Sequence, residues 1–254
     1  NKYLKFLGRL HSINDVDIAL RDANNIFDNI SVDLIYAFHG QKLVDWTNEL
    51  VSFLSKNNLQ HLSLYQLTIE EGTKFFKDYK NGLIEIIDND LAAEFYHVSN
   101  KIISDFKFIE YEISNYARKG FESVHNLVYW RYGDYIGIGP GAHGRLTVDG
   151  KKYATETFLS PEEWLAKVEN QGSGESCVTE LSTEQQAAEM VMMGLRLDEG
   201  VNCKRFETLS GSSFSENKLT FLKSMQLIQQ KEENIIATLS GRKVLNSVLA
   251  EILN

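Results

Sequence analysis

With 26 Lys and Arg against 35 Asp and Glu in 254 residues, the chain carries a net charge of −9, which repels nucleic-acid backbones and anionic membrane surfaces. The longest apolar runs fall far short of the roughly 20 residues that cross a bilayer, and the first residues show no signal-peptide pattern. We therefore expect a cytoplasmic protein with no nucleic-acid partner and no stable membrane insertion. The only cysteines, Cys177 and Cys203, match no metal or redox spacing and are expected to be free thiols.

The first 150 residues predict alternating helices and strands. Apolar residues at three- and four-residue steps predict helices at 14–29, 43–54 and 91–106. Apolar runs rich in β-formers predict strands at 32–38, 61–67, 108–114 and 134–138. This alternation is typical of a parallel α/β sheet or partial barrel, which gathers ligands at the carboxyl ends of its strands. We expect a first domain at 1–150.

From residue 151 onward, helix start signals prevail. Ser160 precedes Pro161 at a first helical position, and Ser182 with Gln185 forms a predicted capping box. The end of the chain predicts a helix at 216–230, a strand at 235–238 and a last helix at 242–253. This outline is similar to a small winged-helix-like domain, which we expect at 151–254.

Several residues have the right chemistry for a site, but each has an ordinary structural explanation. Asp33 interrupts an apolar strand, so its carboxylate needs either a ligand or neighbouring amides as partners. Arg9 suits a ligand carboxylate, although a single arginine is often a surface charge. Glu110 and Glu112 share a predicted strand face, as an acid–base pair or as a solvated edge. The glycine-rich segment 137–144 follows a predicted strand, as a ligand loop or simply as a turn.

None of the six histidines has the spacing of a metal-binding helix. His125 is the most suggestive of them, because it precedes the aromatic pair Tyr129-Trp130. An imidazole ligates iron, and aromatic rings cover a flat porphyrin, whereas packing in the core would explain the same residues.

Eight ordered segments resemble one known family. They are Leu4-Lys-x-Leu-Gly-Arg9-x-His11, Asp33-Leu-Ile-Tyr36, Gly40-Gln41, His61-Leu-Ser-x-Tyr65-Gln-Leu-Thr68-Ile-Glu70, Gly72-Thr73, Tyr111-Glu-Ile-Ser-Asn115, His125-Asn-x-x-Tyr129-Trp130 and Gly137-Ile-Gly-Pro-Gly-Ala142-His143-Gly144. The chain is similar in these segments to the HemW family of heme chaperones, which is related to oxygen-independent coproporphyrinogen III oxidase. The likeness continues through Gly194-Leu-Arg-Leu-x-Glu199-Gly-Val201 to the end.

The resemblance implies an α/β fold, the C-terminal part of a partial radical S-adenosylmethionine (β/α) TIM-like barrel, followed by the helical domain. It implies that Arg9 contacts the methionine carboxylate of S-adenosylmethionine and Asp33 its ribose. Thr68, Ala142 and His143 would line the same pocket, and His125 would contact heme.

Two departures from the family pattern limit what the resemblance implies. The family's C-x-x-x-C-x-x-C loop, which holds a 4Fe-4S cluster, is absent from the sequence, so we expect a truncated chain whose N-terminal segment is missing. Alone it would not be catalytic, unless a separate N-terminal fragment complements it. Phe38-His39 also replaces the usual Leu-Pro before Gly40. The sequence therefore favours heme binding and delivery to an acceptor protein, with radical oxidation of coproporphyrinogen III as the alternative.

Overall fold

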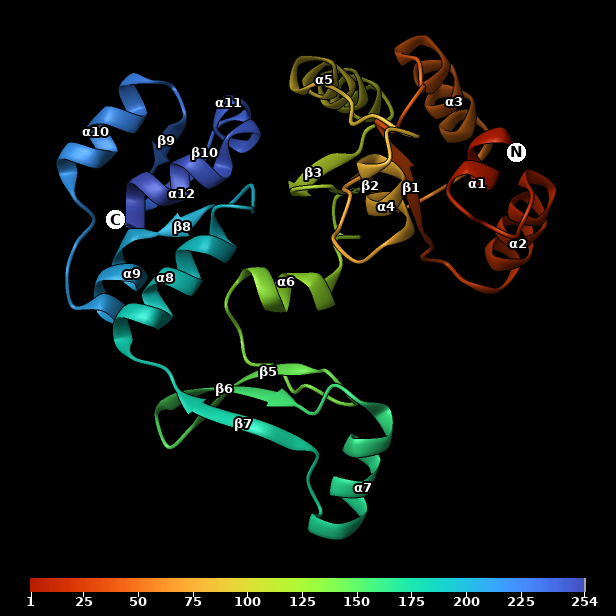
Figure 1. Ribbon diagram of the computed structural model, residues 1–254. Coiled ribbons are helices and arrows are strands. Elements are labelled where there is room, and N and C mark those ends of the chain that lie inside the picture. The colour runs from red at the N-terminus through yellow and green to blue at the C-terminus, as the bar shows by residue number, and fades with distance from the viewer. Residues whose placement is uncertain (254) are drawn as a thin grey trace. The chain divides into compact units, whose positions relative to one another are not determined.

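The computed structural model describes residues 1–253, and the chain forms two compact units, Asn1–Glu122 and Ser123–Asn254 (Figure 1). The first unit contains one four-stranded sheet in the order β1-β2-β4-β3. Its strands are β1 (Ser31–Tyr36), β2 (His61–Gln66), β3 (Ile109–Glu112) and β4 (Asn115–Ala117). β1 and β2 are parallel and in register, whereas β4 is antiparallel to both β2 and β3.

Five helices accompany this sheet, and most begin at a side-chain cap. They are α1 (Lys2–Phe6), α2 (Ile13–Ile26), α3 (Leu43–Lys56), α4 (Lys74–Lys80) and α5 (Asn89–Asp105). Ser12 and Asp15 form a capping box at α2, and Thr73 and Asp88 cap α4 and α5. α3 joins the two parallel strands and completes the predicted β-α-β unit.

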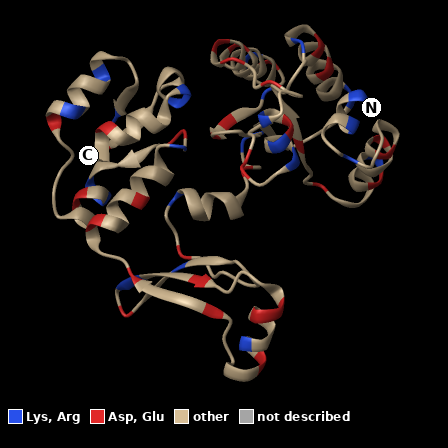
Figure 2. Cartoon of the chain, in the orientation of Figure 1, with Lys and Arg blue, Asp and Glu red and all other residues tan. Residues whose placement is uncertain are grey.

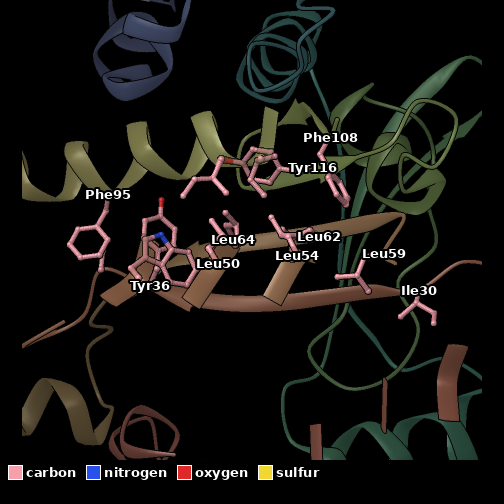
Figure 3. Packing of buried hydrophobic residues seen from close by; sticks show 14 of the residues in the cluster. Ile30, Tyr36, Leu50, Leu54, Leu59, Leu62, Leu64, Phe95, Phe108 and Tyr116 are labelled. Carbon is pink, nitrogen blue, oxygen red and sulfur yellow. The ribbon is translucent and has the colours of Figure 1, made fainter. Parts of the chain in front are cut away.

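The core of the first unit lies between one face of the sheet and the helices. Alternate residues of β1 and β2 point to this face, and Figure 3 shows Tyr36, Leu62 and Leu64 together with Phe95 of α5. Trp46 of α3 stacks on Tyr36 with ring centroids 5.3 Å apart. Its indole Nε1 donates to Ser99 Oγ at 2.8 Å, so the buried ring keeps a hydrogen-bond partner.

The second unit contains two antiparallel sheets, in the orders β5-β6-β7 and β8-β10-β9. The strands are β5 (His143–Val148), β6 (Lys151–Thr157), β7 (Glu175–Glu180), β8 (Val201–Asn202), β9 (Ile228–Lys231) and β10 (Asn234–Ala237). The helices are α6 (Val124–Trp130), α7 (Pro161–Gln171), α8 (Thr183–Gly194), α9 (Cys203–Ser210), α10 (Glu216–Ser224), α11 (Leu239–Lys243) and α12 (Leu245–Leu253). The small sheet β8-β10-β9 among helices α8 to α12 matches the predicted winged-helix-like outline.

Several predicted elements differ in the structure. The strand predicted at 108–114 is present as β3 but ends at Glu112, because the chain turns at Ser114, whose φ is 73°, and continues into β4. The strand predicted at 134–138 is wrong, since only Tyr135 forms a bridge, to Arg145. The helix predicted at 216–230 ends at Ser224, and the φ of 56° at Gln226 prevents its continuation.

The predicted division between 1–150 and 151–254 stays a prediction. It falls in the turn between β5 and β6, which are paired along their whole length. The two compact units instead meet between Glu122 and Ser123. Basic and acidic residues both occur along the helices of each unit (Figure 2). Within residues 1–253, no helix has the length and apolar character needed to span a membrane.

Substitution of Leu50 by Ala should lower the free energy of unfolding by about 2–5 kcal/mol, because this fully buried side chain would leave a cavity. Urea unfolding followed by circular dichroism measures the effect. Leu83→Ala, the same change at a side chain that is 68% exposed, should cost far less. Equal losses in the two variants would contradict the described core.

Candidate functional site

The sheet of the first unit has a second face that is polar. Ser31 and Asp33 of β1 pair in register with His61 and Ser63 of β2, so the four side chains point the same way. We call this the polar sheet face; it consists of Ser31, Asp33, His61, Ser63, Tyr111, Glu112 and Asn115. Most of these residues are buried, whereas Asp33 is exposed. Buried polar groups at this density need hydrogen-bond partners, and the structure provides them.

One hydrogen-bonded chain runs through His61. Its Nδ1 lies 2.7 Å from Ser31 Oγ, and its Nε2 lies 2.8 Å from the Tyr111 hydroxyl. Both ring nitrogens therefore have partners in the neutral imidazole. Burial lowers the pKa of His61, and the nearby negative charge of Asp33 opposes this shift only in part. The ring is thus held neutral beside an exposed carboxylate.

A second chain connects β2 to the hairpin. Ser63 Oγ donates to Asn115 Oδ1 at 2.8 Å, and Asn115 Nδ2 donates to Glu112 Oε1 at 2.5 Å. The Glu112 side chain is almost fully buried. A buried carboxylate requires such donors, because burial without them is very costly.

A β-bulge decides which carboxylate joins this face. The register of β3 against β4 shifts between Glu110 and Glu112, which lets the consecutive residues Tyr111 and Glu112 both reach the polar sheet face. Glu110 instead accepts hydrogen bonds from Tyr96 of α5 at 2.9 and 3.1 Å. The prediction that Glu110 and Glu112 share a face as an acid–base pair is therefore wrong.

Two of the three predicted S-adenosylmethionine residues of the first unit lie just beyond the ends of its elements. Arg9 is exposed and follows α1, and Thr68 is exposed just beyond β2. Asp33 lies in the middle of β1 rather than at its carboxyl end. Carboxylate, guanidinium and hydroxyl groups form a donor and acceptor set that fits the ribose and amino-acid parts of this cofactor. Ala142 and His143 belong to the other unit.

The Phe38-His39 turn, where the chain departs from the family pattern, is well held. Phe38 is 2% exposed and stacks on Phe6 with ring centroids 5.7 Å apart. His39 Nδ1 accepts from the backbone N–H of Glu85 at 3.1 Å, and Gln41 Oε1 accepts from the N–H of Ala37 at 2.7 Å. Side-chain packing and capping thus replace the rigidity that a proline would supply.

The glycine-rich segment 137–144 doubles back on itself. A Cβ at Gly137 would lie 2.5 Å from the carbonyl oxygen of His143, and a Cβ at Gly144 would lie 2.5 Å from Thr155 Oγ1. Close backbone approach therefore requires glycine at both positions. The ordinary explanation, a turn, accounts for these two glycines, while Ile138 between them is 84% exposed.

Ala142 and His143 lie where this segment enters β5. The Ala142 N–H donates to Thr157 Oγ1 at 2.8 Å, and its carbonyl accepts from the Thr157 N–H at 3.0 Å. Both backbone polar groups of Ala142 are thus hydrogen-bonded to Thr157, so only its methyl group could contact a ligand. The His143 ring is 60% exposed, with Nδ1 3.8 Å from Glu156 Oε1.

His125 is exposed on α6, which Ser123 caps by accepting from the N–H of Asn126. The Tyr129 hydroxyl lies 3.1 Å from His125 Nε2, one helical turn away. Tyr129 also packs edge-on against Tyr135, with ring centroids 4.4 Å apart. The exposure of His125 removes the core-packing explanation, and the aromatic rings beside it supply flat apolar surface.

The residues present do not fit a 4Fe-4S cluster. Cys177 is exposed on β7 and Cys203 is half-buried at the start of α9. Across residues 1–253, no three His, Cys, Asp or Glu side chains are grouped so as to hold a metal ion. No chemical step through a cluster can therefore be derived for these residues.

Reasoning from residue chemistry and spacing did not single out His61, Tyr111 or Asn115 as site residues. The signal was present in the segments 61–70 and 111–115, whose polar residues interrupt apolar strands in a recurrent pattern. Their partners, however, are 50 and 52 residues apart along the chain, as in His61 with Tyr111 and Ser63 with Asn115. Only the fold brings them together.

Comparisons with known proteins place the chain among relatives of one kind. Residues 181–244 match the family described as the HemN C-terminal domain. The chain is 36% identical to radical S-adenosyl methionine domain-containing protein 1, mitochondrial, of Mus musculus, over 98% of this chain and 59% of that protein. It is 31% identical to heme chaperone HemW of Bacillus subtilis (strain 168), over 98% of this chain and 66% of that protein.

The fold matches the solved structure of coproporphyrinogen III oxidase (HemN) from Escherichia coli, a radical SAM enzyme. The TM-score is 0.75 at 15% identity, and the match covers 99% of this chain and 61% of that chain. This likeness confirms the expected α/β fold class. The chain spans about three fifths of the length of the mouse protein, with 59% covered.

The neutral state of His61 predicts a pH dependence of stability. Because its pKa is lowered in the folded state, its contribution is fully present above the unfolded-state value of about 6.5 and decreases as the pH falls below it. His61→Gln should therefore flatten the loss of unfolding free energy between pH 7.5 and 5.5, measured by urea titration. His97→Gln, at an exposed histidine of α5, is the control. Parallel pH profiles for His61→Gln and wild type would refute the prediction.

Proposed function

The chain belongs to the family of HemW-like proteins related to HemN, and we propose that it binds heme and delivers it to an acceptor protein. The observation that carries this proposal is the exposed His125 of α6, with Tyr129 one helical turn away. An exposed histidine can reach the iron of a heme that binds at the protein surface. The printed name of the Bacillus subtilis relative, a heme chaperone, supports the same function.

For the heme cargo, His125 would supply the ligand and its neighbours the apolar contacts. Iron binding at His125 Nε2 would replace the contact with the Tyr129 hydroxyl, which is now 3.1 Å away. Tyr129 is held against Tyr135, so its ring cannot easily follow. We propose that the Tyr129 and Trp130 rings flank the porphyrin.

We further propose that S-adenosylmethionine binds through Arg9, Asp33 and Thr68 of the first unit, while the roles expected for Ala142 and His143 stay predictions. In the first unit, Arg9 would take the methionine carboxylate and Asp33 a ribose hydroxyl. Asp33 lies on the polar sheet face, where the neutral His61 ring leaves its charge uncompensated by a cation. In the second unit, the Ala142 backbone is already engaged by Thr157.

The alternative function is radical oxidation of a porphyrinogen, which the match to the HemN C-terminal domain favours. That reaction needs a cluster to supply the electron that cleaves S-adenosylmethionine, and the ligands would have to come from another polypeptide segment, such as a complementing N-terminal fragment. We therefore place heme binding first. A cytoplasmic location remains a prediction, and the mouse relative is named as mitochondrial.

Hemin titration tests the heme proposal directly. The wild-type chain should shift the Soret band of hemin, and His125→Ala should weaken binding by more than about tenfold, because even changes beside a metal ligand have effects of that size. His97→Ala, at an exposed histidine of the other unit, should leave the affinity unchanged. Identical titrations for wild type and His125→Ala would remove His125 as the ligand.

Equilibrium dialysis tests the S-adenosylmethionine proposal. Asp33→Asn should weaken binding by roughly tenfold, since a hydrogen bond to a charged group contributes about 1.5–3 kcal/mol. Asp17→Asn, at an exposed carboxylate of α2, serves as the control. Unaltered affinity in Asp33→Asn would show that its carboxylate does not contact the cofactor.

A further inference from the structure

We propose that Glu199 and Arg205, from the C-terminal part of the second unit, are positioning residues that hold α6 and so aim His125 at heme. The inference rests on the proposed heme-binding function and adds the device that controls it. The helix α6 has only seven residues, and none of them is buried. Helices this short are unstable in water on their own, so the orientation of α6 depends on contacts at its ends.

The first contact is an ion pair at the C-terminal end of α6. Arg131 Nε donates to Glu199 Oε1 at 2.8 Å, and its Nη2 donates to Glu199 Oε2 at 2.9 Å. This two-point geometry fixes direction as well as distance. Glu199 lies in the short connection between α8 and β8, 68 residues further along the chain.

The second contact caps the last carbonyl groups of the same end. Arg205 of α9 donates from Nη1 to the carbonyl of Arg131 at 2.8 Å and from Nη2 to that of Tyr132 at 3.4 Å. Lys152 of β6 donates to the Tyr132 carbonyl as well, at 3.3 Å. Cations at this position satisfy free carbonyls and complement the negative end of the helix dipole.

The third contact involves Trp130, the last residue of α6. The Arg196 guanidinium lies over the Trp130 ring, 5.5 Å from its centroid, in a cation–π contact. A cavity of about 100 Å³ lies beside these groups, lined by residues that include Trp130, Arg131, Glu199 and Arg205. The three contacts together form what we call the α6 clamp.

The α6 clamp separates heme affinity from overall stability. The Arg131 and Glu199 side chains are 52% and 44% exposed, so removing one charge should not unfold the unit. Loss of the Arg131–Glu199 ion pair should instead let α6 adopt orientations in which His125 does not contact the heme iron. Heme affinity then falls while the core is unchanged.

The experiment uses the full chain and the variant Glu199→Gln, which removes the charge and keeps the shape. Hemin affinity should fall about three- to fivefold, the range expected for a half-exposed ion pair. Amide hydrogen exchange of residues 124–131 should become faster in the heme-free protein. Asp22→Asn, which disrupts the exposed pair with Arg21 on α2 of the first unit, should change neither measurement.

A charge exchange provides the rescue. Arg131→Glu alone should weaken hemin binding, and combining it with Glu199→Arg should restore much of the affinity. Simple damage to packing would not be repaired in this way. Arg205→Lys should weaken hemin binding less than Arg205→Ala. The lysine amine can still donate to one of the two carbonyl groups that the Arg205 guanidinium contacts.

Two failures are distinguishable. If the wild-type chain does not bind hemin, the proposed function is overturned, together with the heme role of the α6 clamp. If the wild-type chain binds hemin, while Glu199→Gln leaves both its affinity and the exchange of residues 124–131 unchanged, the α6 clamp alone is overturned.

Discussion

The alternation of side chains along β1 and β2 is the constraint on which the first unit depends. Because these parallel strands are in register, one face collects Leu62 and Leu64 for the helices, and the other collects polar groups. A shift by one residue would bury Asp33 among the helices and expose leucine. The apolar core and the polar sheet face are therefore two results of one pairing, and a change that weakens either would affect both.

Much of this fold could be predicted from the sequence, because its periodic signals are strong. The capped helix α2 and the parallel pair β1 and β2 lie close to their predicted ranges. Strand β7 escaped prediction because every residue of Glu175–Glu180 is exposed, so that β7 lacks the apolar alternation that marks a strand. The bulge at Tyr111 also escaped, since pairing geometry and not residue type creates it.

Candidate site residues divide in the same way. Asp33 became a candidate because its carboxylate interrupts an apolar strand, and His125 because aromatic residues follow it, and the roles of both stay predictions. The residues that surround them or hold their helix could not be predicted, because they lie far away in the sequence. Glu199, for example, pairs with Arg131 at the end of α6 from 68 residues further along the chain. Asp33 is surrounded by a hydrogen-bonded network, and His125 stands on a helix held by its end.

The crossing of Gly137 and Gly144 has a consequence for any molecule that touches the segment between them. The backbones at 137 and 143 lie close together, so the loop between them is closed before any ligand binds. The conformational entropy of the loop is therefore already lost in the free protein. The exposed Ile138, next to Gly137, is then an apolar side chain at the base of a closed loop. Alanine at either glycine would open the loop, because its methyl group does not fit. The preformed surface would then have to become ordered when a ligand binds.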